Sequence, residues 1–202
     1  MNRTLITLIT STLAATVMAA PQSFDFKDPK GVNNAVFKLD APLESINGTA
    51  SGVSGTITYD PDKPETLAGK IIIEAKSLTV PNPMMQEHML GAQWMDVEKH
   101  PEISFEADKV ANVKKSGDKV TADVTGKLSL RGVSKELTVP VSFTYLKDKL
   151  KARSNTEGDL LVVRSTFTIR RADFGINPGA PADKVAEEIE LTLSLAGAAP
   201  KP

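Results

Sequence analysis

The chain has 202 residues, of which 41% are hydrophobic and 24% are charged, and these proportions are ordinary for one globular domain with its own core. The formal net charge of -1 gives no reason to expect a nucleic acid or an anionic membrane as a partner. The absence of cysteine excludes disulfides, thiolate metal sites, cysteine nucleophiles and lipid attachment through cysteine.

The N-terminal segment has the pattern of a secretory signal peptide. Arg3 supplies the positive start, an apolar run extends from Leu5 to Val17, and small residues precede a cleavage site after Ala19. The run is interrupted by threonines and is shorter than the roughly 20 residues of a membrane-spanning helix. We therefore predict a signal peptide over residues 1–19, no stable membrane insertion, and a bacterial periplasmic or secreted location. An uncleaved anchor is the alternative.

The first part of the predicted mature domain has the pattern of β-strands. Three strands are predicted there, at Asn34–Asp40, Ser45–Asp60 and Leu67–Leu78. Glycines at positions 48, 52 and 55 interrupt the second of them. Such glycines indicate sharp bends or bulges, which a closing sheet requires.

Every methionine of the predicted mature protein lies in one short stretch, residues 82–95, together with the only tryptophan. Asn82 is a suitable N-cap, Pro83 suits the first helical position and Gly91 is a suitable stop, so we predict a helix over Asn82–Leu90. Methionine side chains adapt to irregular apolar shapes. We interpret the stretch as a lid, plug or entrance for an apolar ligand; the alternative is that it only caps one end of a β core.

Alternation of apolar and polar residues continues through the second half of the chain. The period of two is strict over Val120–Leu130 and Leu137–Tyr145, as expected for half-buried strands joined by a hairpin connection at 131–134. Pro140 cannot donate a ladder bond and indicates a bulge or a locally unpaired position. The remaining predictions are strands at Glu102–Val110, Leu160–Arg170 and Val185–Leu195 and a flexible tail at 197–202.

About eight antiparallel strands with one apolar face each form either a sandwich or a barrel. An 11-residue run such as Val120–Leu130 extends about 36 Å at about 3.3 Å per residue, and strands of this length favour a tall barrel. The interior of an eight-stranded barrel is either filled by side chains or holds one slender ligand.

The sequence offers few parts for catalysis. His88 and His100 lack the partners of a helical zinc site, and neither a nucleophile elbow nor a glycine-rich phosphate loop is present. We predict no enzyme, no metal site and no cofactor. His88 is either a partly buried histidine bonded to a carbonyl or a polar handle for a ligand head group. Asp173 either forms a solvated ion pair with Arg170 or Arg171, or leaves an arginine to contact an anionic head group.

Three stretches resemble the YceI-like family of polyisoprenoid-binding, lipocalin-like barrels. Glu87–Leu90 followed by Trp94–Phe105 (W-M-D-V-E-K-H-P-E-I-S-F) is similar to the family's helix and the strand after it. Gly126–Phe143, with G-K-L-S-L-R-G-V-S-K, is similar to its hairpin, and Arg171–Ile176 to its R-x-D-F-G turn. The resemblance implies an all-β fold: an extended eight-stranded antiparallel barrel over residues 20–196, with one short helix near the mouth.

The resemblance also implies an apolar lumen that takes a long isoprenoid chain and a site without catalytic residues. We therefore expect non-enzymatic binding, for carriage or storage, of an isoprenoid quinone, a polyprenyl lipid or another long apolar ligand, with a homodimer left open as the assembly. The alternative is a filled barrel that acts as a protein-interaction or stress-related structural module. The expected ligand-binding residues lie on the helix and on apolar strand faces: Met85, His88, Met89, Trp94, Phe105, Val141, Phe143, Phe167 and Ile169.

Overall fold

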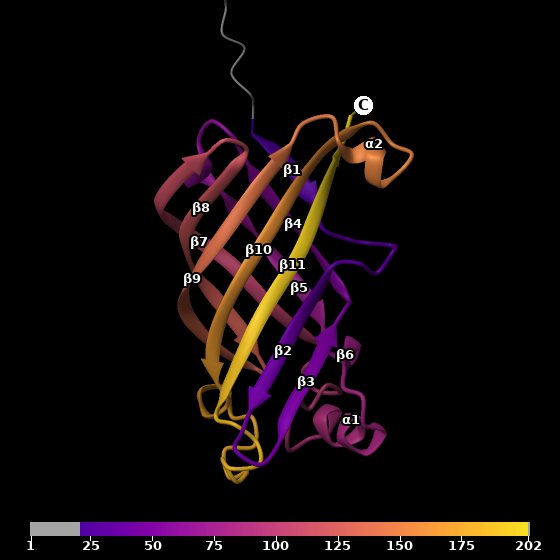
Figure 1. Cartoon of the computed structure of the whole chain (residues 1–202), viewed down its shortest axis with the longest axis vertical. Helices are drawn as coiled ribbons and strands as arrows, with labels where there is room; N and C mark the ends of the chain where they lie inside the picture. The colour runs from indigo at the N-terminus through magenta and orange to yellow at the C-terminus, as the bar shows by residue number, and fades with distance from the viewer. Residues whose placement is uncertain (1–20, 202) are drawn as a thin grey trace, which may run out of the picture.

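The computed structural model describes residues 21–201, and the predicted signal peptide at 1–19 lies outside them. In the described part of the chain, one sheet has the strand order β1-β4-β5-β7-β8-β9-β10-β11-β2-β3-β6, and pairing of β1 with β11 closes it (Figure 1). The predicted eight-stranded antiparallel barrel with one short helix near its mouth is confirmed. No helix in this range is long and apolar enough to cross a membrane.

The elements in chain order are β1 (Gln22–Asp25), β2 (Asn34–Asp40), β3 (Ser45–Ala50), β4 (Val53–Tyr59), the 3-10 turn η1 (Pro64–Thr66), β5 (Ala68–Glu74), η2 (Ala75–Ser77), β6 (Leu78–Thr79), α1 (Pro83–Leu90), β7 (Glu102–Ser116), β8 (Lys119–Leu130), β9 (Val133–Leu146), α2 (Leu150–Arg153), β10 (Gly158–Arg170), η3 (Arg171–Phe174) and β11 (Glu188–Pro200). The two helices lie at opposite ends of the barrel, which are called the α1 end and the α2 end below (Figure 1).

Three of the eight strand positions are each divided into two strands. β1 and β2 both pair with β11. On their other sides, β4 pairs with β1 and β3 pairs with β2. β5 then pairs with β4, and β6 pairs with β3. The predicted strands Ser45–Asp60 and Leu67–Leu78 are therefore each broken once. Gly52 lies at the first break, where a Cβ atom would come within 2.7 Å of the Cβ of Glu74, so the chain crosses closely over η2.

A buried side-chain amide bridges the interval between β1 and β2. Asn33 donates from Nδ2 to the carbonyl oxygens of Phe26 (2.9 Å) and Ala196 (3.1 Å), and its Oδ1 accepts from the N–H of Ala196 (2.8 Å). The amide thus supplies the bonds that a strand would give to β11 at this point. The barrel stays closed although the chain loops away over residues 27–32.

Pro140 ends the pairing between β9 and β10. The two strands pair only from Val141 with Ser165 to Leu146 with Leu160. The carbonyl of Pro140 faces β10 and accepts from Ser165 Oγ (2.7 Å), so its missing N–H falls at the last rung of this ladder. The predicted unpaired position is therefore found on the β10 side, whereas Pro140 still pairs with Asp123 of β8.

The interior at the α2 end is filled by aromatic side chains. The rings of Tyr59 and Phe143 stack with their centroids 5.7 Å apart, and Phe24 meets the edge of Tyr145 at 6.3 Å. These residues belong to one apolar cluster, and Leu161 at its centre is completely buried. A second cluster, which includes Phe37, surrounds the interior at the α1 end.

Several expected boundaries differ from the structure. The strand predicted to end at Val110 continues to Ser116 as β7, and the strand predicted from Val185 begins at Glu188 as β11. Residues 197–200, predicted as part of a flexible tail, are the end of β11 and pair with β10 as far as Gly158 with Pro200. Their inward residues are small because the ring of Phe26 covers Gly197, which hides the alternation. The hairpin connection is shorter than 131–134: only Arg131 and Gly132 lie outside the strands, with φ of 51° and 75°, as in a type I′ turn.

Asp159 anchors the α2 end through a buried carboxylate. Its oxygens accept from the hydroxyl of Tyr145 (2.7 Å) and the N–H of Asp148 (2.8 Å). Burial alone would raise the pKa of this carboxyl, but these hydrogen bonds lower it overall. Burial and the bond to Asp159 also raise the pKa of Tyr145 to about 12.

Gly126→Ala is expected to destabilise the barrel wall. A Cβ atom there would lie 2.4 Å from the carbonyl oxygen of Glu106 and 2.7 Å from Cζ of Phe105. Overpacking of this kind costs about 1–3 kcal/mol, seen as a lower urea midpoint with an unchanged slope. Gly179→Ala is the matched control because a Cβ there meets nothing within 4 Å; equal midpoints for the two variants would contradict the expectation.

Asp159→Asn is expected to flatten the acid limb of the stability profile. Because the pKa of Asp159 is lower in the folded state than its ordinary 3.8, its stabilisation is fully present above pH 3.8 and is lost as the pH falls through the folded value. At neutral pH the variant should lose about 1–3 kcal/mol, the worth of hydrogen bonds to a charged group. Urea unfolding across the acid range measures both effects, and equally steep acid limbs would count against this role.

Candidate ligand-binding cavity

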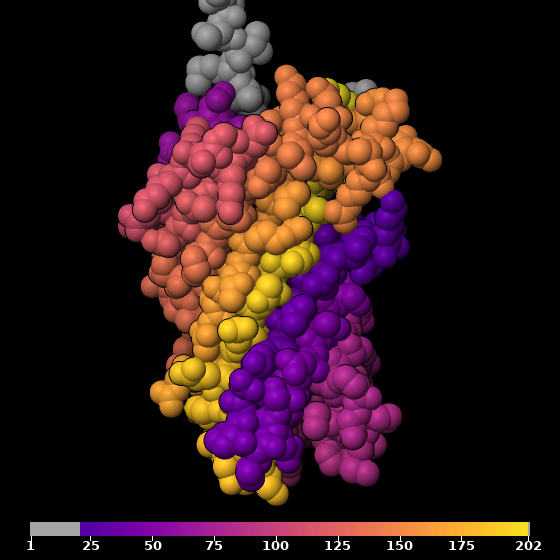
Figure 2. All heavy atoms as spheres, viewed as in Figure 1, coloured from indigo at the N-terminus to yellow at the C-terminus, as the bar shows by residue number. Residues whose placement is uncertain are grey.

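A cavity of about 460 Å³ occupies the barrel interior toward the α1 end. It opens where α1, the β2–β3 turn and the segment at 176–187 approach one another, and a hollow is visible between the β2–β3 turn and α1 in Figure 2. Its volume lies in the range of about 300–1,000 Å³ that is typical of small-molecule sites. The predicted interior is therefore hollow in one part of the barrel and solid in the other.

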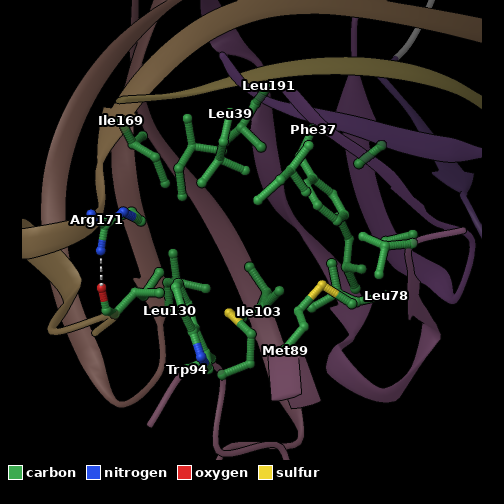
Figure 3. Close-up of a pocket in the computed structure, with 18 of the residues that line it drawn as sticks. Phe37, Leu39, Leu78, Met89, Trp94, Ile103, Leu130, Ile169, Arg171 and Leu191 are labelled. Carbon is green, nitrogen blue, oxygen red and sulfur yellow. Dashed lines mark hydrogen bonds between the residues drawn. The ribbon is translucent and has the colours of Figure 1, made fainter. Parts of the chain in front are cut away.

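The wall of the cavity is made by alternate residues of strands from all sides. Phe37 and Leu39 of β2, Ile103 of β7 and Ile169 of β10 point into the same space (Figure 3). Each belongs to the inward face of its strand, since side chains of a strand alternate between its two faces. The wall is thus aliphatic and aromatic, and a lipid chain fits its chemistry.

The helix α1 covers the open side of the mouth; none of its residues is fully buried, but Met89 and Leu90 are half-buried against the α1-end cluster. Its N-terminus is capped as predicted, because Asn82 Oδ1 accepts from the N–H of Met85 (3.0 Å). Gln86 ties it to the sheet: its Oε1 accepts from the N–H of Val80 (2.8 Å) and its Nε2 donates to the carbonyl of Leu78 (2.7 Å). The Gln86 amide therefore completes the free edge of β6.

Most of the polar side chains that line the cavity lie at its rim, and Ser104 and Arg171 are the buried exceptions among the described lining residues. Glu44, Asn82 and His88 are exposed and line the opening. The His88 ring forms no hydrogen bond with another residue between 21 and 201, so it does not bond a carbonyl; its role as a polar handle for a head group stays a prediction. In the same range, no three side chains of His, Asp or Glu converge as metal ligands.

Arg171 is buried at the cavity wall, and its guanidinium is committed to the protein backbone. Nε donates to the carbonyl of Ala186 (2.7 Å), Nη1 to those of Ile176 (2.9 Å) and Asn177 (2.6 Å), and Nη2 to that of Val185 (3.1 Å). One of the hydrogen bonds of Arg171 is drawn as a dashed line in Figure 3. Arg171 thus folds the segment 176–186 against the barrel, and it has few donors left for a ligand.

The ion pairs around Arg171 differ from the predicted ones. Asp173 lies 3.7 Å from Lys135, and both Arg170 (3.9 Å) and Arg171 (3.4 Å) face Glu187. The guanidinium of Arg171 also lies 5.9 Å from the ring centroid of Trp94, within cation–π range. An anionic head group would find this arginine already paired and covered.

Seven of the nine predicted site residues line the cavity: Met85, His88, Met89, Trp94, Phe105, Phe167 and Ile169. Val141 and Phe143 do not, because they lie in the filled cluster at the α2 end. Alternation assigns them correctly to the inward face, but it carries no information on depth along the barrel. The prediction also missed wall residues on β2, β8 and β11, whose inward alternation gave the same signal.

A closed antiparallel barrel with an apolar cavity that opens at one end defines a lipocalin-like class of fold. The chain belongs to the YceI-like family, since the family model for the YceI-like domain matches residues 19–196. A UPF0312 protein of Pseudomonas putida (strain W619) is 32% identical over 153 residues, which are 75% of this chain and 73% of that protein. A UPF0312 protein of Pseudomonas savastanoi pv. phaseolicola is 32% identical over 154 residues, with the same coverage.

Solved structures share the fold at lower sequence identity. Burkholderia cenocepacia BcnA superposes with a TM-score of 0.65 at 21% identity, covering 81% of this chain and 94% of that one. A polyisoprenoid binding domain from Saccharophagus degradans gives a TM-score of 0.65 at 13% identity, covering 90% of this chain and 100% of that one. These likenesses support the architecture alone.

Arg171→Met is expected to loosen the segment that walls the cavity. The change leaves one buried and three half-buried carbonyls without their donor, at about 1–3 kcal/mol for a fully buried unsatisfied group, so the free energy of unfolding should fall by about 3 kcal/mol. Arg170→Met is the matched control, because its exposed ion pair at 3.9 Å is worth little. Urea unfolding followed by Trp94 fluorescence compares them. Similar losses in the free energy of unfolding for both variants would refute the role of Arg171 in holding the segment 176–186.

Proposed function

We propose that the protein binds an isoprenoid or a similar amphipathic lipid in this cavity, without catalysing a reaction, and carries or stores it. The observation that carries the proposal is the cavity itself, whose wall is apolar except for Ser104 and the backbone-paired Arg171, and whose exposed polar groups lie at the rim. Membership of the YceI-like family supports it. So does the fold shared with a domain from Saccharophagus degradans that is described as polyisoprenoid binding.

The driving force for binding is removal of the lipid tail from water. Burial of apolar area is worth about 25 cal/mol per Å², so a tail that buries some hundreds of Å² gains several kcal/mol. Ordering of the chain and loss of its free motion cost part of this gain. Met85 and Met89 suit the entrance because their flexible side chains adapt to a tail as it passes.

The head group of the ligand would lie at the rim, beside Glu44 and His88. Among the described residues that line the cavity, Arg171 is the one with a permanent positive charge, and its donors face backbone carbonyls. Uncharged head groups such as a quinone, a quinol or a prenol therefore fit the rim better than a phosphate. The Glu44 carboxylate would accept from a hydroxyl, and the His88 ring would donate or accept.

The proposed setting is the periplasm or the outside of a bacterial cell. It is supported by the positive start, the apolar run and the small residues of the predicted signal at 1–19. A lipid that moves between membranes crosses an aqueous space there, and a closed barrel would shield its tail. The rival hypothesis is a filled barrel that acts only as an interaction module. The barrel is filled at the α2 end, but the cavity at the α1 end counts against this hypothesis.

Organic extraction of the purified protein, followed by mass spectrometry, is expected to yield a lipid with an isoprenoid tail in near-stoichiometric amount. Delipidated protein should respond to added prenol by a blue shift in the fluorescence of Trp94, the only tryptophan, because a tail in the cavity excludes water from its ring. Met89→Asp should abolish the response by placing a charge at the entrance. An empty extract together with an unchanged Trp94 spectrum would refute the proposal.

A further inference from the structure

We infer that the cavity limits the length of tail that can be buried to about three or four isoprene units, and that a longer chain projects from the mouth. The inference rests on the proposed function and adds a tail length to it. It depends on the packed side chains that form the floor of the cavity inside the barrel, on the volume between this floor and the mouth, and on the small side chains that create this volume.

The floor is formed where the two apolar clusters meet. Phe105 of β7 and Phe167 of β10 pack against both clusters, and both line the cavity. Behind them, the stacked rings of Tyr59 and Phe143 are almost completely buried. A tail that enters at the α1 end therefore meets protein side chains about halfway along the barrel.

The ring of Phe105 is held in place by the strand beside it. A Cβ atom on Gly126 would lie within 2.8 Å of two atoms of this ring, so the ring lies directly over the glycine. Phe105 also has β-pairing on both sides, to Ile71 and to Leu128. Native interiors are closely packed and repack only partly around a bound group, so the floor does not withdraw to admit a longer chain.

The cavity volume gives the number of carbons that fit. A cavity of 150 Å³ holds benzene, which corresponds to about 25 Å³ per carbon, so about 460 Å³ accommodates roughly 18 carbons. An isoprene unit contributes five carbons. Farnesyl and geranylgeranyl tails therefore bracket the capacity, and longer prenyl tails exceed it.

Two alanines create much of this space. Ala35 of β2 and Ala50 of β3 are paired residues, and both point into the cavity. Larger side chains here would fill the volume that a tail needs, as Phe37 does one step further along β2. The volume available to a tail therefore depends on two sets of residues. The large side chains of Phe105 and Phe167 limit it, and the small side chains of Ala35 and Ala50 enlarge it.

The affinity for prenols of increasing length tests the limit. Prenols delivered from cyclodextrin are titrated into delipidated full-length mature protein, and the dissociation constant is read from Trp94 fluorescence. Each added methylene that is buried strengthens binding by at most about fourfold, so the five carbons of an isoprene unit set a ceiling of roughly a thousandfold. After the cost of ordering the chain, affinity should still rise by at least about tenfold from geraniol to farnesol, and it should rise again toward geranylgeraniol. Geranylfarnesol and solanesol should bind no tighter than geranylgeraniol.

Variants of the floor and of the alanines should move this break in opposite directions. Phe105→Ala removes a ring of benzene size, so geranylfarnesol should bind it more tightly than geranylgeraniol. Ala50→Leu fills the cavity, so geranylgeraniol should bind it no tighter than farnesol. Val32→Ala, at a side chain that is 58% exposed and does not line the cavity, is the control and should keep the wild-type break. Phe105→Leu replaces Phe105→Ala if circular dichroism shows that the latter is unfolded.

The outcomes separate the two proposals. A rise in affinity that ends at geranylgeraniol, with an end point that shifts with Phe105 and Ala50, supports the length limit. Affinity that keeps rising through geranylfarnesol and solanesol overturns the limit and leaves lipid binding in place. A break that ignores both substitutions also overturns it, because the floor would then lie elsewhere. If no prenol of any length binds, lipid binding fails and the limit fails with it.

Discussion

Closure of the sheet forces eight strand positions to share one interior, so the bulk of the inward side chains decides where the barrel is solid. At the α2 end, the inward positions carry aromatic rings such as those of Tyr59 and Phe143, and these stack on one another. At the α1 end, aliphatic side chains and paired alanines leave room. One continuous wall therefore serves two purposes: its filled part stabilises the fold, and the same strands extend from it to enclose a cavity.

Where the sheet is interrupted, polar side chains form the hydrogen bonds that the backbone of a neighbouring strand would otherwise form. The amide of Asn33 replaces a missing rung beside β11, and the amide of Gln86 completes the edge of β6. Arg171 serves the chain in a similar way, by collecting the carbonyls of the segment that walls the mouth. Buried polar groups are tolerated when they are fully bonded. Most of the buried polar chemistry near the cavity thus shapes the protein, which leaves the ligand an apolar site with a few exposed groups at its rim.

Much of the fold was predictable from the sequence because alternation reports directly which face of a strand is buried. It located the long strands β8 and β10 and the capped helix α1 with small errors at their ends. It failed at the end of β11, because Gly197 and Ala199 are too small to produce a clear apolar signal. Alternation also could not separate Phe143 from Phe167, because both are inward phenylalanines. Only the three-dimensional stagger of the strands places Phe143 in the filled cluster at the α2 end and Phe167 at the cavity.

Polar contacts were the least predictable part of the site. The spacing of Asp173 from Arg170 and Arg171 is compatible with several pairs, and the pair that forms, with Lys135, depends on how η3 meets β9. Arg171 holds the segment 176–186 through backbone carbonyl groups. Because every residue has a carbonyl group, no pattern of side chains in the sequence predicts these bonds. Gln86 was unremarked for the same reason, since its partners are backbone atoms of Leu78 and Val80.

The manner in which α1 is attached separates two kinds of motion. Because no side chain of the helix is fully buried, its detachment loses the half-buried contacts of Met89 and Leu90 and a few hydrogen bonds, and it leaves the aromatic cluster at the α2 end intact. Regions with few buried contacts open with a much smaller free energy than the whole domain. Amide protons of α1 should thus exchange with solvent by a subglobal route, whereas those of β8 exchange only on complete unfolding, so the mouth of the cavity opens without loss of the folded barrel.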